Sequence, residues 1–428
     1  MVRLLRLGRT DADVALSSEQ KKSFFDLYHH PFGFAGEELR FRDDSRNTWR
    51  ALETLPGTQV RELTGFLQRA GFMPNAIHDG IYGYVTQAAV RLFQEYVRTI
   101  DDPLRHATRM PASWPDGVVG EDTRYYIDEW KRLGKRCRWS ESGTSSADHR
   151  LWIDRLRKLV IHYRQSPSPL LDRIARFDNP GDTLLPAQWH HDSDLPHLIG
   201  IRRNAHRRLE DSDHRMADDL FILLLNGRSF YFSGSTDATP SRRQEAYLTE
   251  GQHRYRFNWH NIGQQRKHHI YKAGRPAGAG VIVLRDVHGH NALTEANRRD
   301  GLDPAPNPTI NIHWNGLGHG NWSAGCQVIS GRSYLDDEGG FVNCTEYAAR
   351  NAAERGSKRD KQGSRLTMGA YTVLSDLLLC YTRPQDDRQK PTFRYSLFTE
   401  QELAEIAEVD PAKIARKISL LNGGTHLT

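Results

Sequence analysis

A chain of 428 residues is too long for one ordinary hydrophobic core, so two or three domains are expected. The formal net charge is +6, but the lysines and arginines are spread along the chain rather than interleaved with aromatic residues, which argues against a nucleic-acid-binding protein. No apolar run approaches 18 residues, so we expect no membrane span. The N-terminus shows no Sec-type signal peptide.

The four cysteines lie far apart and show no C-x-x-C spacing, which disfavours a zinc ribbon or a redox pair. A disulfide between Cys344 and Cys380 stays open as an alternative. Residues 1–50 are treated as an N-terminal extension that packs on the next domain. Its cluster of aromatic residues and one leucine comprises Phe24, Phe25, Leu27, Tyr28 and Phe32.

Residues 51–135 carry an ordered helical pattern. A first helix with Val60, Leu63 and Leu67 on one face ends at Gly71. The segment D-G-I-Y-G-Y-V-T follows at 79–86, and its threonine is the expected N-cap of a second helix. The apolar face of that helix comprises Ala89, Val90, Phe93 and Val97. The pattern D-G-x-x-G-x-x-T returns at 116–123, which indicates a partial repeat or a third helix of the same module.

The string L-Q-R-A-G-F…D-G-I-Y-G-Y-V-T-Q-A-A-V-R-L-F-Q closely resembles the peptidoglycan-binding type 1 domain, a small three-helix module. The resemblance implies that this module binds the cell wall. The expected wall-binding residues are Asp79, Gly80, Tyr82, Gly83 and Thr86. The alternative is that each Asp-Gly pair serves turn geometry and merely starts a helix.

Residues 138–148 are small and polar and form the expected linker, and residues 148–215 form a helical connector. The buried stripe of its first helix is predicted to be Leu151, Trp152, Leu156, Leu159, Val160 and Tyr163. The histidine-rich segment 188–197 has no i, i+4 pair on a helix, so we interpret it as a polar loop. The same holds for His29-His30 and His268-His269, and no metal site is expected.

Residues 216–382 have the texture of a mostly β domain. The run L-F-I-L-L-L, then Asn226-Gly227, then R-S-F-Y-F predicts a hairpin with a type I′ turn. Further strands are expected over 253–259 and 281–284, a helix near 345–354, and a last strand over 370–375. In the tail, residues 383–428, a capping box at Thr399 and a cap at Asp410 predict two helices, the second of which docks on the body of the protein.

The segment 310–331 reads I-N-I-H-W-N-G-L-G-H-G-N-W-S-A-G-C-Q-V-I-S-G and places one cysteine at a tight turn between two strands. Cys326 follows His313 by 13 residues (326 − 313), and the glycine-rich loop between them is long enough to bring the imidazole back to the thiol. A thiol is mostly protonated at neutral pH, so a cysteine nucleophile needs such a base. The alternative is a structural cysteine in a glycine-rich loop.

Ser323-Ala324-Gly325-Cys326, preceded by His313, resembles the active-site signature of the L,D-transpeptidase (YkuD) family. The resemblance implies Cys326 as the nucleophile, His313 as its base, and Ser323 and Gly325 as loop and oxyanion-hole positions. The flanking residues expected to bind substrate are Trp314, Asn315, Trp322 and Gln327. This chain departs from the common pattern at Ala324, where the family has a histidine, and at Gln327, where it has an arginine.

Together these features predict a multidomain α+β protein, in which an α-helical peptidoglycan-binding module precedes a mostly β YkuD-like sandwich with helical additions. The implied enzyme forms a thioester with a stem tetrapeptide and needs no cofactor. Cross-linking, D-amino-acid exchange and carboxypeptidase action are the expected outcomes. The alternatives are a phage-type endolysin on the same fold and an inactive wall-binding scaffold.

A wall substrate without a visible Sec signal favours delivery by a dedicated secretion system or by phage lysis, with action in the periplasm or cell wall. An exported antibacterial effector would bring an immunity protein or a secretion-system component as a partner.

Overall fold

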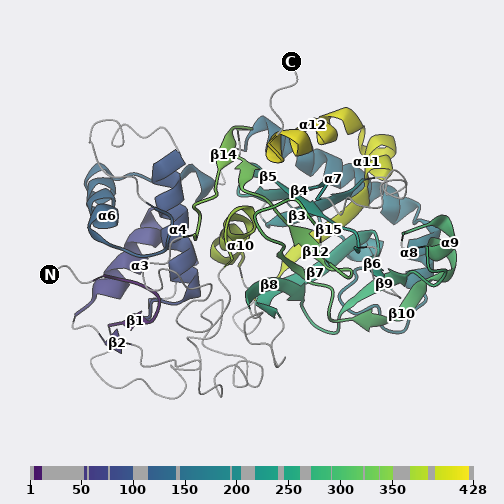
Figure 1. Cartoon of the computed structure of the whole chain (residues 1–428), viewed down its shortest axis with the longest axis horizontal. Coiled ribbons are helices and arrows are strands. Elements are labelled where there is room, and N and C mark those ends of the chain that lie inside the picture. The colour runs from purple at the N-terminus through teal and green to yellow at the C-terminus, as the bar shows by residue number, and fades with distance from the viewer. Residues whose placement is uncertain are drawn as a thin grey trace. The chain divides into compact units, whose positions relative to one another are not determined.

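A computed structural model of the chain divides into two compact units, each described here by itself (Figure 1). The first unit comprises Met1–Glu141, Phe257–Lys272 and Thr345–Pro391, and the second comprises Ser142–Arg256, Ala273–Cys344 and Thr392–Thr428. The structure describes residues 4–11, 53–54, 57–75, 78–99, 114–140, 145–192, 195–203, 217–239, 245–260, 271–290, 292–321, 323–336, 338–349, 367–383 and 391–423.

The first unit is mainly helical and has an aromatic core. Its elements are β1 Arg9–Thr10, β2 Glu53–Thr54, α3 Gln59–Arg69, α4 Tyr84–Thr99, α6 Glu121–Leu133, η1 Arg138–Ser140 and α10 Ala370–Tyr381. The rings of Phe66 on α3 and Phe93 on α4 meet edge to face at 5.4 Å, and Trp130 on α6 packs against Phe93. Such pairs add to the free energy of burial, so α3, α4 and α6 share one core. The helices expected over 51–135 are confirmed, although α4 begins at Tyr84 and therefore places Thr86 in its first turn rather than at the N-cap.

The two Asp-Gly segments form the same local structure. The Asp79 carboxylate accepts a hydrogen bond from the Ile81 amide at 3.0 Å, and Asp116 accepts one from Val118 at 2.8 Å. Gly80 and Gly117 follow with φ of 78° and 75°, which glycine adopts without strain. Each turn leads into a helix, α4 or α6. The repeat is therefore structural as well as sequential.

Helix α10 corrects one expectation, because residues 370–375 form its first half rather than a last strand of the β domain. All twelve of its residues are buried. A helix that is buried on every side shows no apolar periodicity, and its sequence then reads like a buried strand. For the same reason the expected domain boundary at 382 differs from the compact units, since 345–391 belongs to the first of them.

A buried charge cluster ties α10 to α4. Asp376 accepts two hydrogen bonds from Arg91, at 2.7 and 2.9 Å, and one from Lys272 at 2.8 Å. The Tyr347 hydroxyl donates to the same carboxylate at 2.9 Å. Burial alone would raise the pKa of Asp376, but Arg91 and Lys272 hold it below its usual value. The carboxylate therefore stays charged inside the first unit.

Replacing Asp376 with alanine is expected to destabilise the first unit by about 3–5 kcal/mol, because two buried cations lose their counter-charge. Hydrogen exchange of peptides from α4 and α10 would measure the loss. The matched control is Asp128→Ala, which removes an exposed partner of Lys131 on α6 and should leave exchange unchanged. Equal protection in both variants would contradict a stabilising role for the cluster.

The second unit is built on a ten-stranded sheet that closes on itself. The strands are β3 His197–Arg202, β4 Asp219–Leu225, β5 Arg228–Ser235, β7 Gly251–His260, β8 Tyr271–Pro276, β11 Ile312–Trp314, β12 Gln327–Ile329, β13 Ser333–Leu335, β14 Phe341–Asn343 and β15 Phe393–Thr399. Their order is β12-β11-β8-β7-β15-β3-β4-β5-β13-β14, and a further pairing of β12 with β5 completes a ring. A second sheet has the order β10-β9-β6, formed by β6 Ala246–Leu248, β9 Val281–Arg285 and β10 Leu302–Asn307.

The hairpin predicted at Asn226-Gly227 is confirmed. It joins β4 to β5, and both turn residues have positive φ, 45° and 79°. A type I′ turn requires this conformation, whose twist matches that of the flanking strands. The strands expected over 253–259 and 281–284 are also confirmed, as β7 and β9. These elements could be predicted because the residues that determine them are adjacent in the chain.

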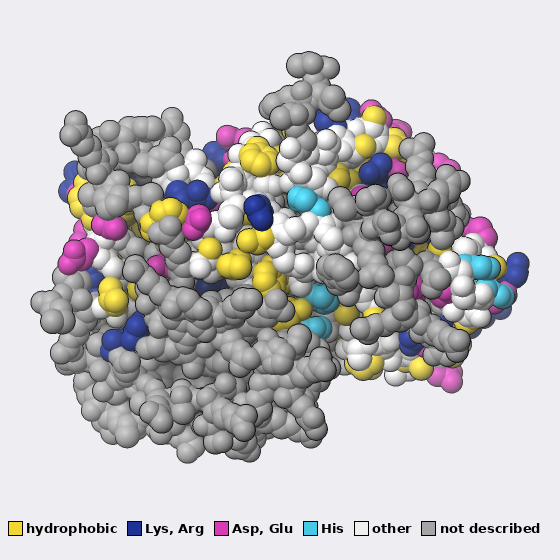
Figure 2. Space-filling view, in the orientation of Figure 1, with side chains coloured by type: hydrophobic (Ala, Val, Ile, Leu, Met, Phe, Trp, Pro, Cys, Tyr) yellow, Lys and Arg dark blue, Asp and Glu magenta, His cyan; other side chains and the backbone are white. Residues whose placement is uncertain are grey.

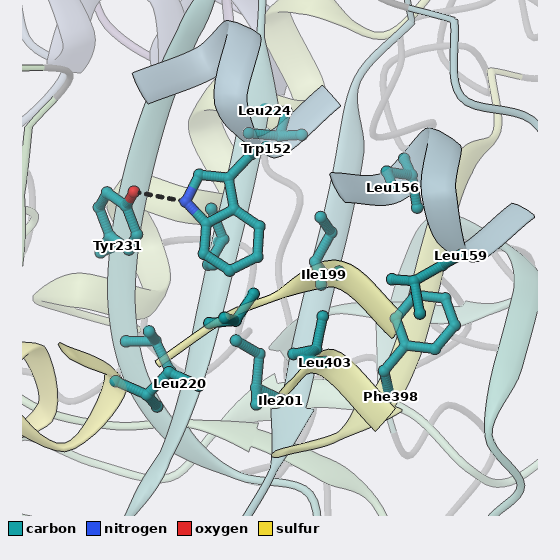
Figure 3. Packing of buried hydrophobic residues seen from close by; sticks show 14 of the residues in the cluster. Trp152, Leu156, Leu159, Ile199, Ile201, Leu220, Leu224, Tyr231, Phe398 and Leu403 are labelled. Carbon is teal, nitrogen blue, oxygen red and sulfur yellow. Dashed lines mark hydrogen bonds between the residues drawn. The ribbon is translucent and has the colours of Figure 1, made fainter. Parts of the chain in front are cut away.

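The helices of the second unit are α7 Ala147–Gln165, α8 Pro169–Ile174, η2 Pro186–Gln188, α9 Glu295–Asp300, α11 Glu400–Ala407 and α12 Pro411–Leu421. Helices α7, α11 and α12 pack on the large sheet, and α9 packs on β9 and β10 of the second sheet. Figure 3 shows Trp152 of α7 among the strand residues, with its indole N–H donating to the Tyr231 hydroxyl at 2.8 Å. The expected connector is thus part of this unit's core, and of its predicted stripe only Leu151 is wrong, at 45% exposure.

The tail also packs on this core. The capping box at Thr399 and Glu402 and the cap at Asp410 are confirmed. Ile414, Ile418 and Leu421 are buried. None of the described helices combines the length and apolar character that a membrane span requires. With its helices and two larger sheets, the protein is a mixed α+β chain. Figure 2 shows charged side chains of both signs interspersed on the face that it displays.

Candidate active site at Cys326

The pairing of β11 with β12 places His313 and Cys326, which directly precedes β12, on neighbouring backbone segments. They run parallel, with Ile312 opposite Gln327 and His313 opposite Val328. The amide of Gln327 also donates to the Asn311 carbonyl at 2.8 Å, so the pairing reaches back to the cysteine. Because side chains alternate between the faces of a sheet, Cys326 and His313 lie on the same face. With an offset of two residues on neighbouring strands, their Cα atoms are about 8 Å apart.

The Cys326 thiol is half-buried and held by the backbone before β11. The Asn311 amide donates to Sγ at 3.3 Å, and the S–H group donates to the Thr309 carbonyl, also at 3.3 Å. Burial raises the pKa of this thiol, and the contacts with Asn311 and Ser323 only partly oppose the effect. The resting group is therefore a thiol rather than a thiolate, and reaction needs a base.

His313 has the tautomer that such a base requires. Its Nδ1 lies 2.9 Å from the carbonyl oxygen of Trp314, which can only accept a hydrogen bond, so Nδ1 carries the proton. The basic lone pair is then on Nε2. Burial lowers the pKa of His313 from its ordinary 6.5, which keeps the ring neutral at pH 7. The hydrogen bonds with the backbones of Thr309 and Asn311 hold the thiol, so proton transfer to His313 would follow the release of these contacts.

Hydrogen bonds of Asn321 and Ser323 hold the loop before Cys326. Asn321 donates to the Ser235 hydroxyl at 3.0 Å and to the Asp237 carbonyl at 2.8 Å. Ser323 donates from its hydroxyl to the Cys326 carbonyl at 2.8 Å and accepts from the Gly325 amide at 3.1 Å. Ser323 therefore shapes the turn, as expected. It also occupies the Gly325 amide.

The amide of Cys326 is therefore the backbone donor that stays available beside the sulfur. In the described part of the chain this N–H group has no acceptor, whereas the Gly325 amide is engaged by Ser323. An amide beside the nucleophilic sulfur can stabilise the negative charge that develops on an attacked carbonyl oxygen. Because its amide is engaged, the role that the structure supports for Gly325 is the backbone conformation of the turn.

Position 325 requires glycine because its backbone lies close to the strand β6. Its φ is 145°, and a Cβ atom there would lie 2.4 Å from the Ala246 carbonyl oxygen. We expect Gly325→Ala to displace the loop and to lower the catalytic rate by about 10²-fold, since small misplacements of a nucleophile are costly. Steady-state kinetics would measure the loss. Ala324→Gly, at the exposed neighbouring position, is the control and should stay near the parent rate.

Of the four residues expected to bind substrate, three are described, and no hydrogen bond to the Cys326 thiol is recorded for any of them. Gln327 is fully buried and accepts from the Tyr395 hydroxyl at 2.8 Å, so its assignment is corrected to a core position. Trp314 lies on the face of β11 opposite His313. Asn315 donates to the Gly320 carbonyl and closes the glycine-rich loop. Trp322 lies outside the described residues.

Residues that the sequence analysis missed also shape the site. Thr309 and Asn311 contact the thiol through their backbones, and the Tyr255 hydroxyl donates to the Ile310 carbonyl between them at 3.1 Å. Strand alternation in the sequence already places Asn311 on the same face as His313, but it does not show that the Asn311 amide contacts the thiol. No local pattern announces Tyr255, because β7 and β11 are separated by more than fifty residues.

The wall-binding assignments within the first unit need correction. Tyr82 has no exposed surface and donates to the Gly117 carbonyl at 2.8 Å, and Thr86 is 2% exposed. Gly80 and Gly83 are buried as well. One carboxylate oxygen of Asp79 accepts a hydrogen bond from the Ile81 amide within the same turn. The contacts of Tyr82 and Thr86 are internal to the first unit, which favours the alternative interpretation for these two residues, whereas Asp79 is partly exposed and its wall-binding role stays a prediction.

The remaining expectations concern metals, disulfides and the N-terminal cluster. The described residues contain no group of three metal-ligating side chains, and in the segment 188–197 His197 is buried against the Asp192 carbonyl. All four cysteines are free thiols, so Cys344 and Cys380 are not joined. The aromatic cluster at 24–32 and the pairs His29-His30 and His268-His269 lie outside the described residues. Of the helix expected near 345–354, residues 345–349 are described and form turns rather than a helix, and the rest lies outside the described residues.

Comparisons of the chain with protein-family models, with curated proteins and with solved structures found no match.

Proposed function

We propose that this protein is a peptidoglycan-modifying cysteine enzyme that acts on stem tetrapeptides through a thioester, with a second unit of the L,D-transpeptidase type. The observation that carries the proposal is the register of β11 and β12, which sets a neutral imidazole two residues along from a half-buried thiol on the same face. The S-A-G-C segment and its resemblance supply the substrate class. Such a substrate places the site of action in the cell wall.

In the proposed reaction, His313 Nε2 takes the proton from the Cys326 thiol as the sulfur attacks the carbonyl of the diamino acid in the stem peptide. The Cys326 amide stabilises the resulting oxyanion. The C–N bond to D-alanine then breaks, and the imidazolium returns its proton to the leaving amine. An amine or a water molecule attacks the thioester, gives its proton to the same imidazole, and releases the sulfur, which regains the proton.

The raised pKa of Cys326 favours this stepwise proton transfer over a preformed thiolate–imidazolium pair. A protonated resting thiol is less open to oxidation and alkylation, because the thiolate is the reactive form. Binding of the peptide would displace the thiol from the Thr309 carbonyl and free it for His313. The proposal therefore predicts a nucleophile that is activated only when substrate is present.

Mass spectrometry of muropeptides incubated with the protein tests the function. New 3–3 cross-linked dimers or D-amino-acid exchange products would support a transferase, and shortened or released stems would identify a hydrolase of the endolysin kind. Unchanged muropeptides would overturn the enzymatic proposal and leave a wall-binding scaffold. A covalent adduct on Cys326, found by intact-mass measurement with a tetrapeptide substrate, would place the thioester directly.

A further inference from the structure

The second unit contains a cavity of about 780 Å³ whose lining does not include Cys326 or His313. It lies where β3 and β15 end and β7 begins, between α8, α9 and α11. Pockets that bind small molecules have volumes of roughly 300–1,000 Å³ and combine an apolar floor with a few placed polar groups. This cavity has both components.

The floor is aromatic and rigid. The rings of Tyr163 and Trp189 meet at 5.5 Å, and those of Trp189 and Phe398 at 6.0 Å, both in edge-to-face arrangements. Gly251 follows at the start of β7 with φ 126°, and a Cβ atom there would come within 3.0 Å of the Trp189 ring. The three rings of the floor are therefore held in place by one another and by the backbone at Gly251.

A buried ion-pair network forms one wall. Glu250 accepts from Arg202 at 2.8 Å and from Arg298 at 2.9 and 3.0 Å. Burial alone would raise the pKa of Glu250, but the two arginines lower it to about 2. Burying three charges costs desolvation free energy that a plain apolar wall would avoid. The network holds Arg298 and the end of α9 at a fixed place beside the opening.

The rim carries charged side chains of both signs whose hydrogen-bonding groups are only partly engaged. Within the described residues, the guanidinium of Arg203 makes one hydrogen bond, from Nε to Glu400 at 3.1 Å, which leaves its Nη groups as donors. Arg173 uses only Nη1, toward the Arg298 carbonyl at 3.0 Å. Glu405 accepts from Gln401 through one oxygen and is exposed, as is Glu295. Guanidinium groups bind carboxylates, and carboxylates bind ammonium groups.

We propose that this cavity is a binding site, separate from the Cys326 site, for a small zwitterion that carries at least one carboxylate and one ammonium group, such as an amino acid or a short peptide. A purely anionic ligand would face Glu295 and Glu405, and a purely cationic one would face Arg173 and Arg203. Like-charge juxtaposition of this kind discriminates against the wrong ligand.

Isothermal titration calorimetry with three matched probes tests the proposal. The probes are meso-2,6-diaminopimelate, pimelate, which is the same chain without its amines, and cadaverine, which is the same chain without its carboxylates. The full chain carrying Cys326→Ala is used, so the result does not depend on catalysis. We expect diaminopimelate to bind and each single-sign probe to bind at least about tenfold more weakly.

Charge-neutral variants assign the heat to the cavity. Arg203→Gln and Glu405→Gln should each weaken binding of diaminopimelate about tenfold, and Leu170→Trp, which fills the cavity from α8, should abolish it. Arg157→Gln, on the exposed side of α7, is the control and should bind like the parent. The proposal is overturned by absence of heat for every probe up to about 10 mM, by equal affinity for pimelate, or by binding that ignores all three cavity variants. Circular dichroism of each variant verifies that it is folded.

Discussion

Cys326→Ala is expected to abolish turnover of tetrapeptide muropeptides, with a loss of at least about 10³-fold, because no other group at the site can form the thioester. The thiol is half-buried at the edge of the turn rather than in the core, so the variant should keep the parent's stability. Product formation by mass spectrometry and the unfolding midpoint would be measured on the same preparation. Residual activity near that of the parent would exclude Cys326 as the nucleophile.

The matched control is Cys380→Ala, which removes a buried thiol from α10 in the first unit and should leave turnover unchanged. A second readout follows from the pKa of Cys326. Burial raises this pKa above its ordinary 9.0, so the resting protein holds a protonated thiol at pH 7. Alkylation by iodoacetamide should therefore be slow at pH 7 and accelerate above pH 9, as the thiolate fraction grows.

Features carried by a few adjacent residues could be predicted from the sequence. The type I′ turn at Asn226-Gly227 and the capping box at Thr399 are such features, since the turn and the cap are satisfied by their own neighbours. The Asp-Gly turns were also predictable as turns. A sequence pattern did not reveal that Tyr82 and Thr86 are buried, which argues against a direct role of these two residues in wall binding.

Features that depend on distant segments could not be predicted. Helix α10 is buried on every side and so lacks the periodicity that would distinguish it from a strand. The nearness of His313 to Cys326 was expected from loop length alone, but the parallel register that creates it depends on where β12 pairs with β5. The same register sends Gln327 into the core, which reversed its expected role.

His313→Gln is expected to lower the rate of acylation by about 10²–10⁴-fold, the usual contribution of a general base. Glutamine can still donate to the Trp314 carbonyl, so the turn after β11 is preserved while the basic lone pair is lost. Single-turnover formation of the Cys326 adduct would measure the effect. The other imidazole in the glycine-rich loop, His319, provides the control, and His319→Gln should retain the parent rate if His313 is the base.

The pH profile separates a base from a merely structural histidine. Because burial lowers the pKa of His313 below 6.5, the imidazole is neutral at pH 7 and becomes protonated only as the pH falls through that lowered value. Activity of the parent should therefore be level near pH 7 and decline on the acid side of pH 6.5. In His313→Gln the acid decline should vanish along with most of the rate. A variant that is slow but keeps the same acid decline would show that another group titrates, and the proton acceptor for Cys326 would then have to be sought among the residues that reach the site when substrate binds.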